Sequence, residues 1–129
     1  MTAADLLESD RFAAALMGVR LVEAAEDRLV VEMDLGPGHF DRSGSVAAGV
    51  LFSLADCAMS LMSNRNRQAV AVATHLTRFG DGSGATSLRA EAVVGSPGIG
   101  RATTWQASVS ADGARIAAFT GTTLAVGGG

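Results

Sequence analysis

The chain has 129 residues and a mass of 13.0 kDa, which is the size of one domain and leaves no room for a second core of ordinary size. Hydrophobic residues make up 48% of the sequence and charged residues 18%, so disorder is excluded for most of the chain. The net charge is −3 and all ten cations are Arg, without a basic patch, so nucleic acid is not an expected partner. We therefore expect a single domain over residues 1–129.

Membrane, export and metal signals are weak. The longest apolar stretch, residues 46–62, is interrupted by Ser53, Asp56 and Ser60 and falls short of the roughly 20 apolar residues of a membrane span. Acidic residues precede the first Arg, which is the reverse of the basic start of a secretory signal. One Cys and two His cannot form a zinc cluster. We expect a cytoplasmic protein without a membrane segment, structural metal or cofactor.

The first part of the chain predicts a helix and two strands. Apolar residues recur at helical spacing within residues 5–17, and Gly18 is expected to end that short helix. The β-rich runs 19–23 and 29–33 predict two strands with a hairpin-length connection between them. The polar stretch 39–45 has no periodicity and predicts a loop of the kind that often carries function.

A long helix is predicted over residues 47–63, because at about 100° per residue its apolar side chains fall on one stripe. The opposite stripe lacks the long charged side chains of a solvent-facing helix, so we expect it to meet protein or ligand. The apolar stripe comprises Val50, Leu51, Leu54, Ala58, Leu61 and Met62, and the opposite stripe Gly49, Phe52, Ser53, Asp56, Ser60 and Ser63.

Four more strands are predicted over residues 69–79, 87–94, 101–110 and 114–126, followed by a frayed end at 127–129. The sequence 111–113 gives a strong hairpin signal between the last two strands. Because helices do not alternate with the strands, a parallel doubly wound sheet is excluded. We expect an α+β fold in which a curved antiparallel sheet of five to six strands wraps around one long central helix, with a short N-terminal helix.

Asp56 carries the strongest chemical signal. A carboxylate within an apolar helix costs free energy unless it is paired, hydrogen-bonded or protonated. Two interpretations stay open. Asp56 is either a structural group that caps a loop or meets an Arg across a subunit contact, or a nucleophile or general base.

The start of the same helix offers a complementary feature. The small residues Ala47, Ala48 and Gly49 leave the first-turn N–H groups uncrowded at the positive end of the helix dipole, where a developing oxyanion could be held. Close packing is the alternative explanation. Gly49 and Asp56 lie about 10 Å apart along the helix axis, too far to act on one carbonyl. Two antiparallel helices of a dimer would bring them together.

Residues 41–56, which begin Asp-Arg-Ser-Gly and end Leu54-Ala55-Asp56, resemble the signature of hotdog-fold acyl-CoA thioesterases of the phenylacetate-degradation type. In that signature an Asn-x-x-Gly loop and a His-Gly-Gly helix start precede a Leu-Ala-Asp helix, and the likeness in element order spans residues 18–126. The resemblance implies hydrolysis of an acyl-CoA to the free acid and CoA without a cofactor. It also implies a site shared across a homodimer, with a tetramer of two dimers as a further possibility.

The resemblance implies a role for several residues. Asp56 would attack the thioester or activate water, and the N–H of Ala48 would polarise the carbonyl with the N–H of Gly49 nearby. Thr74, on the strand after the helix, is the candidate for orienting water.

Substrate contacts are expected around the helix. Arg65 and Arg67 follow its end, where they are either solvated charges that suit the dipole or ligands of the CoA phosphates. Phe52 is expected to pack at a helix–helix contact and could touch the acyl group. Ala47 and Ser53 complete the expected binding residues.

The chain departs from the signature in three places. Ala47 stands where the family has His, and Asp41 stands where it has Asn. Asp41 cannot donate an amide hydrogen bond, so it is either an Asx-turn residue or a catalytic group. The run Phe-Gly-Asp-Gly at 79–82, after Thr74, lacks the Pro of the family's Phe-x-x-Pro.

These departures keep a second function open, a catalytically weak hotdog domain that binds acyl-CoA or a protein partner. A hydratase on the same fold ranks last, because its Gly-Asp-x-Asn-Pro run is absent. The other reactive side chains have structural explanations. Cys57 is expected to be a small buried hydrophobe, His75 an interior or interface residue, and His39 an exposed loop residue.

Overall fold

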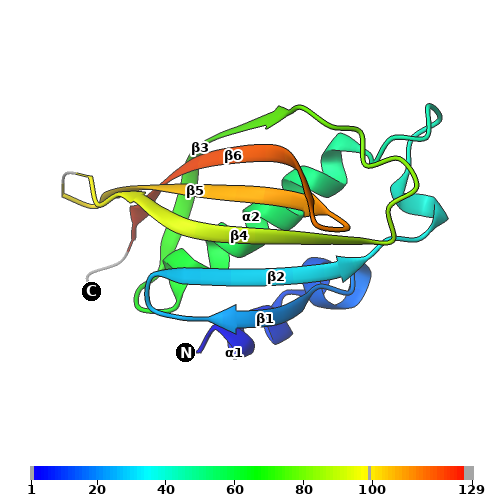
Figure 1. The fold of residues 1–129 in the computed structure, drawn as a ribbon. Helices are drawn as coiled ribbons and strands as arrows, with labels where there is room; N and C mark the ends of the chain where they lie inside the picture. Colours follow the sequence, from blue (N-terminus) through cyan, green and yellow to red (C-terminus); the bar gives the residue numbers. More distant parts are fainter. Residues whose placement is uncertain (1, 99, 127–129) are drawn as a thin grey trace.

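The computed structural model describes residues 2–98 and 100–126, so the predicted frayed end at 127–129 lies outside the described residues. A six-stranded antiparallel sheet curves around helix α2 (Ala48–Asn64), which lies across one face of the sheet (Figure 1). The α+β architecture predicted from the element order is confirmed, and it is that of the hotdog fold which the family resemblance implies. The strands are β1 (Arg20–Ala24), β2 (Arg28–Asp34), β3 (Ala69–Arg78), β4 (Ser87–Ser96), β5 (Ala102–Ala111) and β6 (Ala114–Ala125).

The strand order β1-β2-β4-β5-β6-β3 places β1 and β3 at the two edges of the sheet. All five neighbouring pairs are antiparallel. The β5–β6 hairpin turns at Asp112 and Gly113, whose φ angles of 47° and 88° suit the Asp-Gly pair that predicted this turn. No helix of residues 2–98 and 100–126 is long and apolar enough to cross a membrane.

The core forms between α2 and the sheet. Leu51, Leu54 and Ala58 of the predicted apolar stripe have no exposed surface. Met59 packs on β6 at Gly121, where a Cβ atom would overlap its sulfur atom. Phe52 makes an edge-on contact with Phe119 of β6 at 5.6 Å between ring centroids. Within the subunit the partner of this ring is therefore the sheet, and the expected helix–helix contact of Phe52 stays a prediction.

The N-terminal helix is divided in two. Helix α1 (Ala3–Ser9) is followed by a separate turn of π-helix, η1 (Arg11–Leu16). The Asp10 carboxylate accepts hydrogen bonds from the N–H groups of Phe12 and Ala13, both at 3.1 Å, and so begins a new helix instead of continuing the first. The expected single helix over 5–17 is wrong in this respect. Gly18, with φ +69°, ends the segment as predicted.

The segment before α2 is held firmly although it has no periodicity. It contains the short 3-10 helix η2 (Pro37–His39) and an isolated bridge between Phe40 and Val46. This loop fixes the direction in which α2 enters the sheet and presents the first turn of the helix at the surface.

Candidate active site

Asp56 lies midway along α2, on the side that faces the N-terminal segment and the start of β3. Its partly buried side chain lines two adjacent hollows of 80 Å³ and 250 Å³. Ser60, one turn further along the helix, lines both hollows with it. The smaller hollow also contains Asp10, Phe12, Ala13, Ser53 and Cys57, and the larger contains Met59, Ser63, Asn64, Ala69, Val70, Ala71 and Thr123.

The Asp56 carboxylate has no hydrogen-bond donor or cation as a partner among residues 2–98 and 100–126. Every ion pair of that part of the chain involves Arg20, Arg28 or Arg89 instead. Burial raises the pKa of Asp56, and the Asp10 carboxylate raises it further. A structural role within its own subunit would require a partner, and the described chain supplies none.

The first turn of α2 is fixed in place by the loop that precedes it. The N–H of Ala47 donates to the His39 carbonyl at 2.9 Å, and the N–H of Val46 donates to the Asp81 carbonyl at 2.8 Å. The Arg78 guanidinium donates to the Val46 carbonyl. These bonds hold the helix tip without using the amides of its first turn.

Those amides are available to a ligand. Ala47 occupies the N-cap position without a side-chain hydrogen bond, and the N–H groups of Ala48 and Gly49 have no acceptor in the described part of the chain. Both residues are exposed. A Cβ atom at Gly49 would meet nothing within 4 Å, so packing within this subunit does not require a glycine here. The close-packing explanation therefore needs atoms from outside the subunit.

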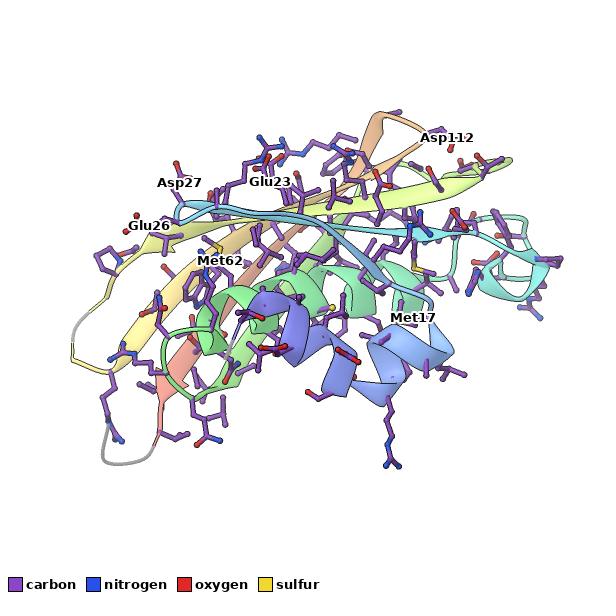
Figure 2. All side chains as sticks on the ribbon, turned by 90° about the horizontal axis from the view of Figure 1, so that it is seen from below. Met17, Glu23, Glu26, Asp27, Met62 and Asp112 are labelled. Carbon is purple, nitrogen blue, oxygen red and sulfur yellow. The ribbon has the colours of Figure 1, made fainter. Side chains whose placement is uncertain are left out.

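An apolar hollow of 460 Å³ opens beside this tip, between η1 and α2. Figure 2 shows Met17, one of its lining residues, well apart from Met62. Phe12 and Leu16 expose 53% and 74% of their surfaces beside it. Its lining also includes Gly38, His39, Ala47, Gly49, Val50 and Ser53.

His39 is a site residue that the sequence interpretation missed. Its Nδ1 atom accepts a hydrogen bond from the N–H of Gly36 at 2.9 Å, so in the neutral ring the proton lies on Nε2. The residue is half-buried, and the expected full exposure is wrong. The imidazole lines the same hollow as Ala47 and Gly49. A Gly three residues before a His, at a helical turn, was the available signal.

Asp41 forms an Asx turn, which is one of the two interpretations its sequence left open. Its Oδ1 atom accepts from the N–H of Ser43 at 2.9 Å, the hydroxyl of Ser43 at 2.6 Å and the N–H of Ser45 at 3.2 Å. The Ser43 hydroxyl is the main cause that lowers the pKa of Asp41. Asp41 lines none of the hollows beside Asp56 or Gly49.

Thr74 and the two arginines after α2 lie apart from the carboxylate. Thr74 is paired with Gly121 and lines a different hollow, of 440 Å³, so the catalytic role of Thr74 stays a prediction. Arg65 donates to the Glu26 carbonyl at 2.7 Å, which ties its guanidinium to the β1–β2 turn. Arg67 lines a hollow at the far end of α2.

The remaining reactive side chains, Cys57 and His75, do not form a second candidate active site within the described residues. Cys57 is buried as predicted, and burial raises the pKa of its thiol to about 12. His75 is exposed on the edge strand β3 instead of lying in the interior. Within the described residues, no group of three or more His, Cys, Asp or Glu side chains could hold a metal ion.

Comparison with known proteins gives this geometry a context. No family model matches the sequence. The PaaI protein of the phenylacetic acid degradation operon of Escherichia coli is 27% identical, with a TM-score of 0.88 over 98% of this chain and 92% of that protein. A mutant of the phenylacetic acid degradation protein PaaI from Thermus thermophilus, with one Asn replaced by Asp, is 31% identical, with a TM-score of 0.80 over 88% of this chain and 97% of that one.

A curated protein of Deinococcus radiodurans, provisionally named an esterase, is 33% identical over 66 residues. That match covers 51% of this chain and 45% of the relative, so the chain spans less than half of that relative's length. The Thermus relative is matched over nearly its whole length at more than 30% identity. The chain therefore belongs to the family of the PaaI proteins.

Proposed function

We propose that this protein hydrolyses an acyl-CoA thioester to the free acid and CoA, with Asp56 as nucleophile or general base. The observation that carries the proposal is the Asp56 carboxylate itself. It is partly buried, has no partner within the described chain, and lines two hollows. A carboxylate held at this cost in free energy, without a partner and beside a hollow, is a candidate reactive group.

The oxyanion site in this proposal is the exposed tip of α2. The uncapped N–H groups of Ala48 and Gly49 point out of a helix whose entry is already fixed by hydrogen bonds, so they need no rearrangement when charge develops on the carbonyl oxygen. Donors preorganised in this way stabilise the tetrahedral intermediate more than the ground state.

A second copy of the chain completes the proposed site. Within one subunit the tip and Asp56 are separated by about 10 Å of helix. Strand β3 is an unpaired edge, and its Val70 and Val72 expose 48% and 53% of their surfaces. A long apolar edge is expected to be covered. A two-fold dimer through β3, with antiparallel α2 helices, would bring Asp56 of one subunit to Gly49 of the other, and two such dimers could form a tetramer.

Two routes satisfy the chemistry. In one, the Asp56 carboxylate attacks the thioester carbon, CoA leaves as its thiolate, and water hydrolyses the mixed anhydride to release the acid and restore the carboxylate. In the other, Asp56 removes a proton from a water molecule that attacks the same carbon, and the thiolate leaves with that proton. Both routes need an ionised Asp56 and donors at the carbonyl oxygen.

Replacement of the carboxylate tests the proposal. Asp56→Asn and Asp56→Ala are assayed for thiol release over a panel of acyl-CoAs, with Asp27→Asn, an exposed carboxylate of the β1–β2 turn, as control. Loss of a group of this kind typically costs orders of magnitude in rate. Unchanged turnover in folded Asp56→Asn would exclude this mechanism.

The binding-only function has one observation in its favour. The Asp41 carboxylate is occupied by three donors and offers no amide N–H to a substrate carbonyl. A wild-type protein that binds acyl-CoA without releasing thiol would establish this second function in place of the first.

A further inference from the structure

A positively charged hollow lies at the C-terminal end of α2, away from the exposed tip. It has a volume of 280 Å³ and lies between the end of the helix and strands β4, β5 and β6. In Figure 2 its lining residue Met62 lies on α2 toward the β1–β2 turn, where Glu26 and Asp27 are labelled. Arg67 and Arg101 line the hollow from two different parts of the chain.

The two guanidinium groups have no anionic partner. Neither Arg67 nor Arg101 forms an ion pair with a described residue, and no carboxylate lines the hollow. Within the described residues, the Arg101 guanidinium donates to the Ala125 carbonyl, at 3.5 Å. Arg67 alone would be an ordinary cation at a helix end. Arg101 adds a second guanidinium group to the same hollow, and two guanidinium groups suit the binding of phosphate.

An aromatic ring accompanies the charges. Trp105 of β5 lines the same hollow, and its indole N–H donates to the Thr123 hydroxyl at 2.8 Å, which fixes the ring in place. A fixed aromatic ring beside arginines is the combination that binds a nucleobase together with its phosphates.

The hollow adjoins the space beside Asp56. Ser63, Ala69 and Thr123 line both the 280 Å³ hollow and the 250 Å³ hollow that contains Asp56. Asp56 and Ser63 are about 10 Å apart along the helix, and the arginines lie beyond Ser63. The uncharged pantetheine arm of CoA would join a thioester beside Asp56 to a nucleotide in this adjoining hollow.

We propose that this hollow binds a phosphorylated adenosine, the nucleotide of acyl-CoA, with Arg67 and Arg101 on the phosphates and Trp105 against the adenine. The inference rests on the proposed function for the thioester at Asp56. The sequence had suggested Arg65 and Arg67 for the phosphates. The structure favours Arg101 in place of Arg65, because Arg65 is tied to the Glu26 carbonyl.

Nucleotide binding is measurable without turnover. Trp105 is the single Trp of a chain that has no Tyr, so intrinsic fluorescence reports on this hollow. We expect adenosine 3′,5′-bisphosphate to give a saturable change, and ADP and pyrophosphate, titrated in parallel, to bind more weakly. Arg67→Gln and Arg101→Gln replace exposed side chains and should each weaken binding about tenfold or more, because each removes a charged phosphate contact.

Arg65→Gln is the matched control and should bind like the wild type. A wild type that does not bind the bisphosphate, or glutamine variants at 67 and 101 that bind it as tightly as the wild type, would overturn the inference. Tighter binding of ADP than of the bisphosphate would also overturn it, since the hollow would then belong to a free nucleotide.

Kinetics separate this inference from the proposed function. With an acyl-CoA substrate, Arg67→Gln and Arg101→Gln should raise KM about tenfold with little change in kcat. With the S-acyl-N-acetylcysteamine thioester, which lacks the nucleotide, they should match the wild type. Asp56→Asn should bind the bisphosphate normally. If the wild type binds the bisphosphate but does not hydrolyse acyl-CoA, the proposed function alone is refuted. If the wild type hydrolyses both substrates and neither Arg→Gln variant changes the kinetics with either of them, this inference alone is refuted.

Discussion

Asp10 and Asp56 line the same 80 Å³ hollow although they come from different elements, and the Asp10 carboxylate raises the pKa of Asp56. Asp10 is also the N-cap of η1. One carboxylate therefore begins a helix and adjusts the charge of another. The N-terminal segment is part of the site's electrostatics as well as a cover over α2.

The first prediction concerns pH dependence. Asp10→Asn should keep the helix cap, because Asn is as good an N-cap residue as Asp, while it removes the negative charge. The pKa of Asp56 should then fall toward its ordinary value. Because both proposed routes require ionised Asp56, the acidic limb of kcat/KM against pH should move to lower pH. Burial, the larger cause, should keep part of the elevation.

The control for this profile is Glu8→Gln, which removes a negative charge from an exposed position of α1, two residues before Asp10 in the sequence. The control should leave the acidic limb in place. An Asp10→Asn profile that coincides with the wild-type profile would show that the two carboxylates do not interact during turnover.

The second prediction concerns stability. The pKa of Asp56 is higher in the folded chain than its ordinary value. The contribution of Asp56 to the free energy of unfolding is therefore fully present below its ordinary pKa, and it is lost as pH rises through the higher pKa that Asp56 has in the folded chain. At neutral pH the ionised carboxylate therefore opposes folding. Asp56→Asn should raise the Tm by a few degrees at neutral pH while it abolishes activity.

Thermal unfolding at several pH values checks this sign. The difference in Tm between Asp56→Asn and the wild type should shrink as pH falls below the ordinary carboxyl range, where Asp56 is neutral in both states. A variant less stable than the wild type at neutral pH would mean that Asp56 has a stabilising partner, such as an Arg across a subunit contact.

The elements were predictable because their signals are local. The spacing of apolar residues in α2 and the Asp-Gly turn at 112–113 are properties of neighbouring residues, and the predicted bounds lie within one or two residues of the observed ones. The break at Asp10 was harder to predict, because the same carboxylate can either cap a new helix or lie within a continuous one.

The site was predictable only in part. Asp56 stands out in the sequence because it is the single charged residue of the long helix. The pairing of Asp56 with Asp10, of Arg67 with Arg101, and of His39 with the tip of α2 depends on how distant segments pack, and no spacing in the sequence encodes it. Arg65 and Arg67 look equivalent in the sequence, and only the bond from Arg65 to the Glu26 carbonyl separates them.

The third prediction removes one backbone donor from the helix tip. Ala48 is the first residue of α2, a position that accepts Pro, and Ala47 before it has φ −60° and ψ 137°, which suits the residue that precedes Pro. Ala48→Pro should keep the helix and delete the N–H. If that N–H holds the oxyanion, kcat should fall by about 10²- to 10³-fold.

Ala48→Ser keeps the N–H at the same exposed position and serves as the control. Circular dichroism and Tm should be similar for the two variants. Full activity in well-folded Ala48→Pro would mean that another donor stabilises the carbonyl oxygen. The Gly49 N–H and the His39 imidazole, which line one hollow, are the candidates.

The fourth prediction tests whether two subunits share the site. Lys on an exposed edge strand opposes pairing with a second strand. Val72 of β3 exposes 53% of its surface, and Val22 exposes 46% on β1, the opposite edge of the sheet. Val72→Lys should therefore shift the protein to monomers in sizing experiments and reduce kcat/KM by orders of magnitude, whereas Val22→Lys should leave both unchanged. Dimerisation and activity should be lost together. The monomer keeps its Asp56 carboxylate but loses the partner's helix tip, and its own tip lies about 10 Å away along the helix.

Mixing inactive Asp56→Asn with inactive Ala48→Pro adds an independent measurement of the shared site. In a mixed dimer, one site carries both defects and the other site is intact, because each site takes its carboxylate from one subunit and its helix tip from the other. Activity should therefore recover on mixing, although neither variant is active alone. A fully active Val72→Lys monomer, or a mixture that stays as inactive as its components after subunit exchange, would contradict a site built from two subunits.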